Sequence, residues 1–137
     1  MHDHYKKILA DTERMAERCL PKQNLQENSP FFGAFLQPDG MYQAKSTIYR
    51  FATLLAVYIN EESRFYHDPS LIKPMLLALD YVDRVQHENG LFDYVPCNFC
   101  SAPDTVFCIV KLCPHYPYLP GLSSLTDAEY MLLDRLG

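Results

Sequence analysis

The sequence predicts an all-α protein in which outer and inner helices alternate. Two observations carry this prediction. Segments that are apolar on one face (residues 4–19 and 74–87) alternate with segments that are apolar around their whole circumference (46–60 and 106–113). In addition, residues 37–42, Gln-Pro-Asp-Gly-Met-Tyr, match residues 87–92, His-Glu-Asn-Gly-Leu-Phe, at an offset of 50, which indicates a repeated supersecondary unit.

Each expected helix has its own signals. The first ends at Pro21, and a polar connection with the turn signal Pro38-Asp39-Gly40 follows. Asp68 or Ser70 can cap the helix over 74–87, and Asp104 caps the apolar helix after it. Thr126-Asp127-Ala128-Glu129 is a capping box that opens one further helix to residue 136. We therefore expect two outer/inner hairpins plus one further helix, with both long loops at one rim.

Length and composition favour one domain over residues 1–137. The chain is 48% apolar, enough for one hydrophobic core. Its 12 basic and 17 acidic side chains give a net charge of -5, and its longest basic run is Lys6-Lys7, so we expect no nucleic-acid partner. The longest apolar run, residues 54–59, is far shorter than the ~20 residues of a membrane span, so we expect no membrane partner.

The expected compartment is the cytoplasm. The first residues, Met-His-Asp-His-Tyr-Lys-Lys, have no apolar segment of the signal-peptide type. Five cysteines cannot all pair within one chain, so reduced thiols are expected.

A family resemblance enters at residues 86–93, Gln-His-Glu-Asn-Gly-Leu-Phe-Asp, and 98–107, Asn-Phe-Cys-Ser-Ala-Pro-Asp-Thr-Val-Phe. With the alternating helices, these segments resemble the amino-terminal α/α toroid region of bacterial heparinase II/III-like proteins, which are polysaccharide lyases and their relatives. The resemblance covers roughly residues 31–112. It implies a partial toroid from a polysaccharide-active protein, and because family members have more hairpins and a β-sandwich, a piece that is not catalytically complete alone.

The resemblance implies β-elimination on a uronic-acid polysaccharide. That reaction needs a group to neutralise the carboxylate, a base and an acid. Asn98 is the candidate for the first role, and Tyr94 or His87 for proton transfer. Expected substrate-binding residues are Asp39, Tyr42, Phe92, Tyr94, Asn98 and Asp104. Aromatic loop residues can stack on sugar rings, and the candidates are Phe31, Phe32, Tyr42, Phe92, Tyr94 and Phe99.

Local roles compete with these assignments. Asn98 can satisfy loop backbone groups, Asp39 suits a turn, and Asp104 suits a helix cap. A hydrolase of the same architecture is a further alternative, in which Asp39 pairs with Asp93 or Asp104 for acid/base work on a glycosidic bond.

A zinc site is suggested by Cys97-Asn98-Phe99-Cys100, with Cys108, Cys113 and His115 downstream. Cys108 and Cys113 lie five residues apart on one helix and point about 140° apart, so they cannot both face the loop. We therefore expect no metal and no cofactor.

A helical interaction module without catalysis is the rival class. Two helices that are apolar all round need more neighbours than the other helices can supply, so an apolar edge should stay exposed. We expect missing residues of a longer chain, or a second copy, to cover that edge.

Overall fold

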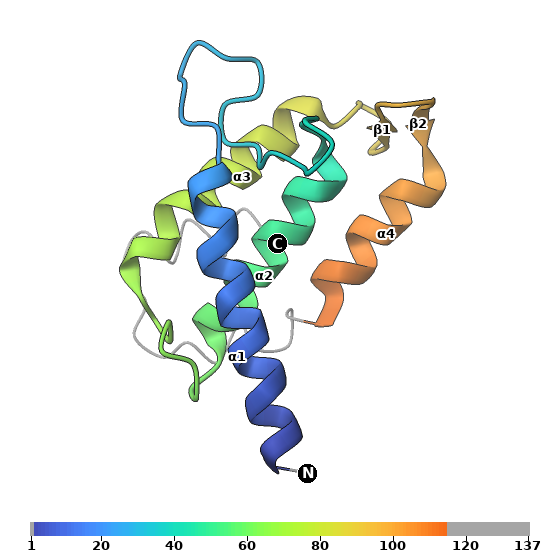
Figure 1. The fold of residues 1–137 in the computed structure, drawn as a ribbon. Helices are drawn as coiled ribbons and strands as arrows, with labels where there is room; N and C mark the ends of the chain where they lie inside the picture. The colour runs from blue at the N-terminus through green and yellow to red at the C-terminus, as the bar shows by residue number, and fades with distance from the viewer. Residues whose placement is uncertain (1, 115–137) are drawn as a thin grey trace.

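The computed structural model describes residues 2–114 (Figure 1). In chain order these form α1 (His2–Cys19), η1 (Leu20–Lys22), α2 (Ala44–Ile59), η2 (Pro69–Leu71), α3 (Ile72–Val85), β1 (Phe92–Tyr94), β2 (Asn98–Ser101) and α4 (Ala102–Leu112). The helix predicted over residues 126–136 lies outside the described part.

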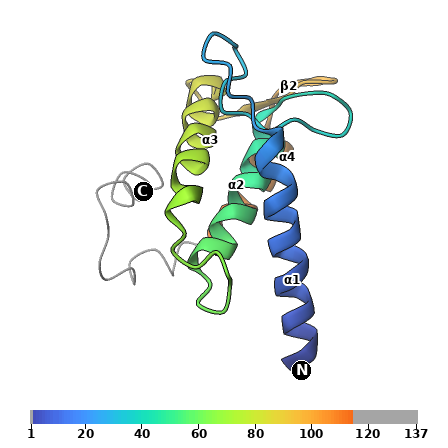
Figure 2. The same cartoon turned by 60° about the vertical axis from the view of Figure 1, so that its left-hand side comes forward.

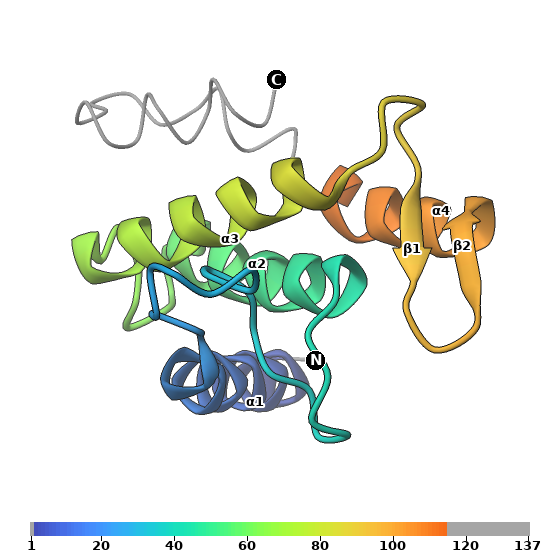
Figure 3. The same cartoon turned by 90° about the horizontal axis from the view of Figure 1, so that it is seen from above.

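Helix α2 is the centre of the fold. It lies between α1 and α3, and it also contacts α4 (Figures 2 and 3). None of its residues is exposed, and Thr47, Leu54 and Val57 are fully buried. The prediction that residues 46–60 form a helix is confirmed, but burial on every side is not, because Tyr49, Arg50 and Thr53 are half-buried and line an open hollow. Within the described part of the chain, none of the helices is both long and apolar enough to cross a membrane.

Two groups of buried side chains form the core. The larger joins α1, α2 and α3, and it contains Phe35, Phe51, Leu55, Tyr58 and Met75. The smaller lies beneath the two repeated turns, where it joins the first turns of α2, the last turns of α3, β1 and α4. Its members are Ala34, Ala44, Ile48, Tyr81, Val82, Phe92 and Cys108. This second group fixes the relative positions of the segments that build the site described below.

The connection from α1 to α2 is ordered. Gln23 pairs with Phe35 in an isolated β-bridge, and its side-chain amide donates to the carbonyls of Gly33 and Pro74, both at 2.9 Å. Arg84 on α3 donates to the carbonyl of Phe32 at 2.7 Å. These contacts attach the connection to α3, so its aromatic residues have fixed places.

The first repeated turn closes through backbone hydrogen bonds. The Gly40 N–H donates to the Gln37 carbonyl and the Gln37 N–H to the Met41 carbonyl, both at 3.0 Å. The Asp39 side chain accepts from the Met41 N–H at 3.0 Å. Gly40 has φ +82°, a left-handed conformation that favours glycine.

The second turn repeats this geometry 50 residues later. The Gly90 N–H donates to the His87 carbonyl at 2.8 Å, and the His87 N–H to the Leu91 carbonyl at 3.0 Å. Asn89 takes the place of Asp39, since its side-chain oxygen accepts from the Leu91 N–H at 3.1 Å. Gly90 also has φ +82°. The sequence repeat is therefore a repeat of one turn structure.

The all-α toroid prediction is wrong, because residues 92–101 hold a two-stranded antiparallel hairpin. Phe92 pairs with Ser101 and Tyr94 with Asn98. Aromatic residues favour strands, and the Cys97 N–H closes the hairpin turn on the Tyr94 carbonyl at 3.0 Å. The domain therefore combines four helices with a small sheet in the described residues.

Helix α4 also differs from the prediction. Its N-cap is Ser101, not Asp104: the Ser101 hydroxyl accepts from the Asp104 N–H at 3.3 Å and donates to the Asp104 carboxylate at 2.6 Å. The helix is not enclosed, because only Thr105 and Cys108 are buried. Four large apolar side chains on it are more than half exposed: Val106, Phe107, Ile109 and Val110.

Candidate functional site

A cavity of about 460 Å³ lies between the two repeated turns. One side comes from the connection before α2, the opposite side from β1 and the residue after it, and the floor from α3. The lining residues are Phe31, Gly40, Met41, Tyr42, Gln43, Ala44, Tyr81, Val85, Asp93 and Val95. Segments far apart in the sequence therefore meet at one hollow.

Aromatic side chains form one wall of this cavity. The rings of Phe31 and Tyr42 stack with centroids 5.0 Å apart and planes 17° apart. Phe31 is exposed and Tyr42 half-buried, so the pair presents aromatic surface to solvent. Tyr81 is almost fully buried, and that burial raises the pKa of its hydroxyl. The wall can hold an apolar face of a ligand.

Gln43 lines the cavity and is only 5% exposed. Its side-chain oxygen Oε1 is buried and has no hydrogen-bond partner among the described residues. Gln43 is the N-cap position of α2, but its side chain caps no helix N–H. A buried acceptor without a donor costs about 1–3 kcal/mol, so its presence in a folded protein needs an explanation, such as an ordered water molecule, an ion or a functional role.

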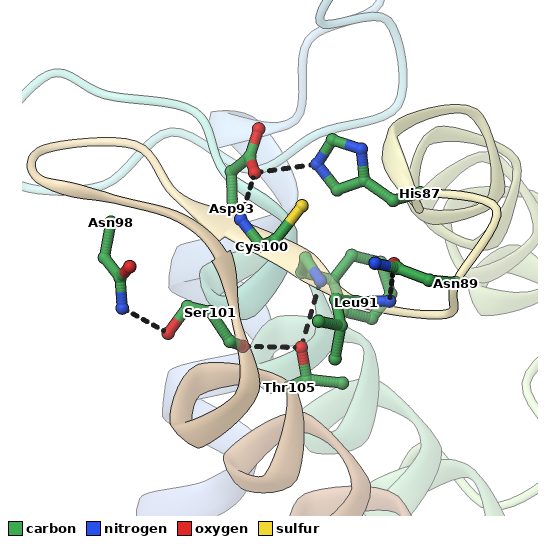
Figure 4. Close-up of polar contacts among 9 residues, drawn as sticks. His87, Asn89, Leu91, Asp93, Asn98, Cys100, Ser101 and Thr105 are labelled. Atoms are coloured by element: carbon green, nitrogen blue, oxygen red, sulfur yellow. Dashed lines mark hydrogen bonds and ion pairs between the residues drawn. The ribbon is translucent and has the colours of Figure 1, made fainter.

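Asp93 supplies the charged group. Its Oδ1 accepts from the Cys100 N–H at 2.8 Å and lies 2.7 Å from His87 Nε2 (Figure 4). The Cys100 N–H, and then the His87 hydrogen bond, lower the pKa of the Asp93 carboxyl below its ordinary value. Asp93 is therefore a carboxylate at neutral pH.

The cavity is built from equivalent positions of the two turns. Gln43 lies six residues after Gln37, and Asp93 lies six residues after His87, with the offset of 50 between the pairs. The second pair is joined by a hydrogen bond. In the first pair, both Gln43 Oε1 and Gln37 Nε2 are buried without partners. The polar pair at the second turn is therefore hydrogen-bonded, whereas the equivalent pair at the first turn is not.

Three residues predicted from the sequence occupy the hairpin. Phe92 is buried in the core and does not line the cavity. Tyr94 has its ring 5.6 Å from Lys45 Nζ. Asn98 donates to the Ser101 hydroxyl at 3.1 Å and so supports the cap of α4 (Figure 4). Neither Tyr94 nor Asn98 lines the cavity, whereas His87 lies at its edge through Asp93.

Of the three remaining predicted residues, one lines the cavity and two have structural roles elsewhere. Tyr42 lines the cavity, but Asp39 is a turn residue whose carboxylate binds the Met41 N–H. Asp104 forms an ion pair with Lys45 at 2.7 Å. That hydrogen bond from Lys45, and then the Ser101 hydroxyl, lower the Asp104 pKa. Asp104 therefore joins α4 to α2 and does not belong to the cavity.

Sequence reasoning did not identify Gln43 or Tyr81 as site residues, and it considered Asp93 only for hydrolase chemistry. The repeat carried a usable signal for Gln43, because the same offset that aligns Gly40 with Gly90 aligns Gln43 with Asp93. Tyr81 gave no such signal, since a tyrosine within an apolar helix stripe is ordinarily a core residue.

The cysteine motif is divided by the fold. Donor atoms of His87, Asp93 and Cys100 all lie within 4.8 Å of one another, and Cys97 is not in that group. Cys108 is buried, which raises the pKa of its thiol to about 11. Cys113 is exposed, and His115 lies outside the described residues. The four cysteines first considered for zinc therefore do not converge among residues 2–114.

Comparison of the chain with protein-family models, with curated proteins and with solved structures found no match.

Proposed function

We propose that this chain binds carbohydrate in the cavity between its repeated turns, as part of a polysaccharide-active protein of the heparinase II/III-like kind that it resembles. The observation that carries the proposal is that the stacked rings of Phe31 and Tyr42 line one cavity together with the Gln43 side chain and the Asp93 carboxylate. A sugar offers both matching surfaces, because its C–H face packs on aromatic rings and its hydroxyl groups donate hydrogen bonds.

The size of the cavity supports this proposal. Ligand pockets in proteins commonly enclose about 300–1,000 Å³, and this one has about 460 Å³. One sugar ring would place hydroxyl groups near two polar side chains of the lining, the Gln43 amide and the Asp93 carboxylate. The two hydrogen bonds to Asp93 both use Oδ1, which leaves Oδ2 as an acceptor for a ligand.

The charge of the cavity supports binding of a neutral sugar over elimination on a uronate. Among residues 2–114, its lining includes the Asp93 carboxylate and no Lys, Arg or His. The nearby cation Lys45 is already paired with Asp104. A uronate carboxylate inside the cavity would therefore meet a like charge with nothing to neutralise it, so we propose binding of a neutral sugar ring and not β-elimination at this place.

Nuclear magnetic resonance with isotope-labelled protein tests the proposal. Neutral and uronate-containing oligosaccharides are titrated in turn, and neutral ones should shift the backbone signals of Gln43 and Asp93. The variants Gln43→Leu and Tyr42→Ala should weaken binding at least tenfold. Tyr66→Ala is the matched control, because Tyr66 is an exposed aromatic residue outside the cavity.

Two results would count against carbohydrate binding at this cavity. One is the absence of signal shifts with any oligosaccharide at millimolar concentration. The other is equal weakening by Tyr66→Ala and Tyr42→Ala, which would assign the effect to nonspecific aromatic contact. Tighter binding of uronate than of neutral oligosaccharide would contradict the charge argument alone.

A second candidate function, a helical interaction module, is favoured by the exposed face of α4. Helix α4 packs on α2 and β1, while Val106, Phe107, Ile109 and Val110 remain open. We propose that a second copy of the chain covers this face. Sedimentation equilibrium should then show a species larger than the 15.9 kDa chain, and Val110→Lys should reduce it to monomer. A wild-type monomer at high micromolar concentration would rule this out.

A further inference from the structure

We propose that His87, Asp93 and Cys100 form a site for one zinc ion at the edge of the cavity. This goes beyond the proposed carbohydrate binding and does not depend on it. The three side chains come from the second repeated turn after α3, from β1 and from β2, and the hairpin brings them together (Figure 4). One donor atom from each lies within 4.8 Å of the other two.

These distances are close to those of a bound ion. Tetrahedral zinc with bonds of about 2.0–2.3 Å holds its donor atoms roughly 3.3–3.8 Å apart. In the structure His87 Nε2 and Asp93 Oδ1 share a hydrogen bond of 2.7 Å, so they must separate slightly. Both side chains are partly exposed, His87 by 40% and Asp93 by 31%, which leaves them free to make that movement.

The chemistry of the three donor atoms favours zinc over magnesium and calcium. One imidazole nitrogen, one carboxylate oxygen and one thiolate sulfur suit zinc, whereas magnesium and calcium prefer oxygen donors alone. Three protein donors leave a fourth position for water or another ligand. Because Asp93 lines the cavity, an ion held there would lie at its edge, within reach of an oxygen atom of a ligand in the cavity.

The backbone of Cys100 gives independent support. Cys100 has φ +51°, a conformation that residues with a side chain rarely adopt. The hydrogen bond to Asp93 uses only the backbone N–H of Cys100, so it does not require a cysteine. Glycine or asparagine would suit this conformation better. The hairpin itself therefore does not require a cysteine at position 100, whereas the proposed metal site would use its thiol.

The surrounding hydrogen bonds hold the backbone beside the donor residues in place, while the donor side chains can adjust. The His87 N–H closes the second repeated turn on the Leu91 carbonyl. Ser101, next to Cys100, is fixed as the N-cap of α4, and Thr105 donates to its carbonyl at 2.7 Å. Such preorganisation of neighbouring groups strengthens metal binding. The equivalent positions of the first turn are Gln37 and Gln43, which are poor zinc ligands, so the site belongs to the second repeat only.

Equilibrium dialysis of the whole chain against zinc, under a non-chelating reductant, tests the proposal. The background is His2→Ala with His4→Ala, which removes a second histidine source at the N-terminus. One equivalent of zinc should bind. His87→Gln and Cys100→Ser keep similar size and polarity, and each should weaken binding at least tenfold. Cobalt in place of zinc should show a sulfur-to-metal charge-transfer band that Cys100→Ser abolishes.

Cys97→Ser is the matched control. It changes the neighbouring exposed thiol of the same hairpin and should leave zinc affinity unchanged. Equal losses in Cys97→Ser and Cys100→Ser would overturn the proposal in favour of a paired-cysteine site. Less than half an equivalent of zinc on the background protein would overturn it too, as would unchanged affinity in His87→Gln and Cys100→Ser.

The test separates this site from the carbohydrate site. Gln43→Leu should abolish sugar binding and retain zinc, because Gln43 is not one of the donors. If sugar binding fails and zinc binding succeeds, only the proposed function is wrong. Circular dichroism of each variant confirms that a lost metal does not reflect a lost fold.

Discussion

Gln43 and Asp93 occupy equivalent positions after the two repeated turns and line the same cavity. One side chain offers a buried oxygen without a partner, and the other a carboxylate bound to His87 and to the Cys100 N–H. The repeat therefore builds a two-sided site in which the halves have different chemistry.

Gln43→Leu should raise the stability of the protein or leave it unchanged. The substitution removes a buried acceptor that has no donor, and no helix cap is lost. We expect a gain of up to about 1 kcal/mol in the free energy of unfolding, together with loss of sugar binding. Urea denaturation measures the first effect. A clear loss of stability would show that Gln43 has a structural role.

Gly33→Ala should be more destabilising than Gly40→Ala. Both glycines have positive φ, +88° and +82°, so alanine costs roughly 1–2 kcal/mol at either position. At Gly33 an added Cβ would also lie 2.0 Å from the carbonyl oxygen of Leu77, whereas at Gly40 nothing lies within 4 Å. Forced rearrangement adds about 1–3 kcal/mol at Gly33 only. Thermal unfolding of the two variants makes the comparison, and equal losses would contradict the close approach to α3.

Thr105→Val should destabilise the fold by about 1–3 kcal/mol. The Thr105 hydroxyl accepts from the buried N–H of Phe92 at 3.0 Å, and valine of similar shape leaves that N–H without a partner. Thr53→Val is the control, because the Thr53 hydroxyl only donates to the Tyr49 carbonyl of its own helix. Chemical denaturation should show a change of about 0.5 kcal/mol or less for the control.

Asp104→Asn should cost about 1 kcal/mol at neutral pH, since the carboxylate is paired with Lys45 and bonded to Ser101. Because the Asp104 pKa is lowered in the folded state, its contribution is present above the unfolded value, about 3.9, and is lost as pH falls through the folded pKa. The stability difference between wild type and variant should therefore shrink below about pH 4. A difference that stays constant down to pH 2 would refute the pairing.

Buried and exposed thiols should react at different rates. Burial raises the pKa of Cys19 and of Cys108 to about 11, so at pH 8 roughly one thiol in a thousand is ionised at these positions. Cys97 is exposed in the hairpin. Iodoacetamide followed by peptide mass spectrometry should label Cys97 and the other exposed thiols, Cys100 and Cys113, in the native protein, and the two buried thiols only after denaturation. Rapid labelling of Cys19 in the native protein would contradict its packing between α1 and α2.

Local patterns in the sequence were enough for the helices and the turns. The apolar periodicity predicted α1, α2 and α3 to within about two residues, because one-faced burial has a fixed period of 3.6. The Asp39-Gly40 and Asn89-Gly90 pairs predicted two turns, since glycine alone adopts positive φ without strain and the short polar side chain before it bonds the next backbone N–H.

Contacts between distant segments determined three features: the pairing of residues 92–101 as strands, the exposed face of α4 and the set of side chains that meet at the site. Residues 92–101 pair as strands through contacts across the hairpin that no helical period reveals, and α4 is open on one side because the described residues provide no neighbour there. Gln43, Asp93, His87 and Cys100 come close only once the two turns pack against α3. Sequence by itself determined which segments are helical, because that depends on neighbours along the chain. Which side chains face one another depends on contacts between distant segments, and only the folded chain brings those segments together.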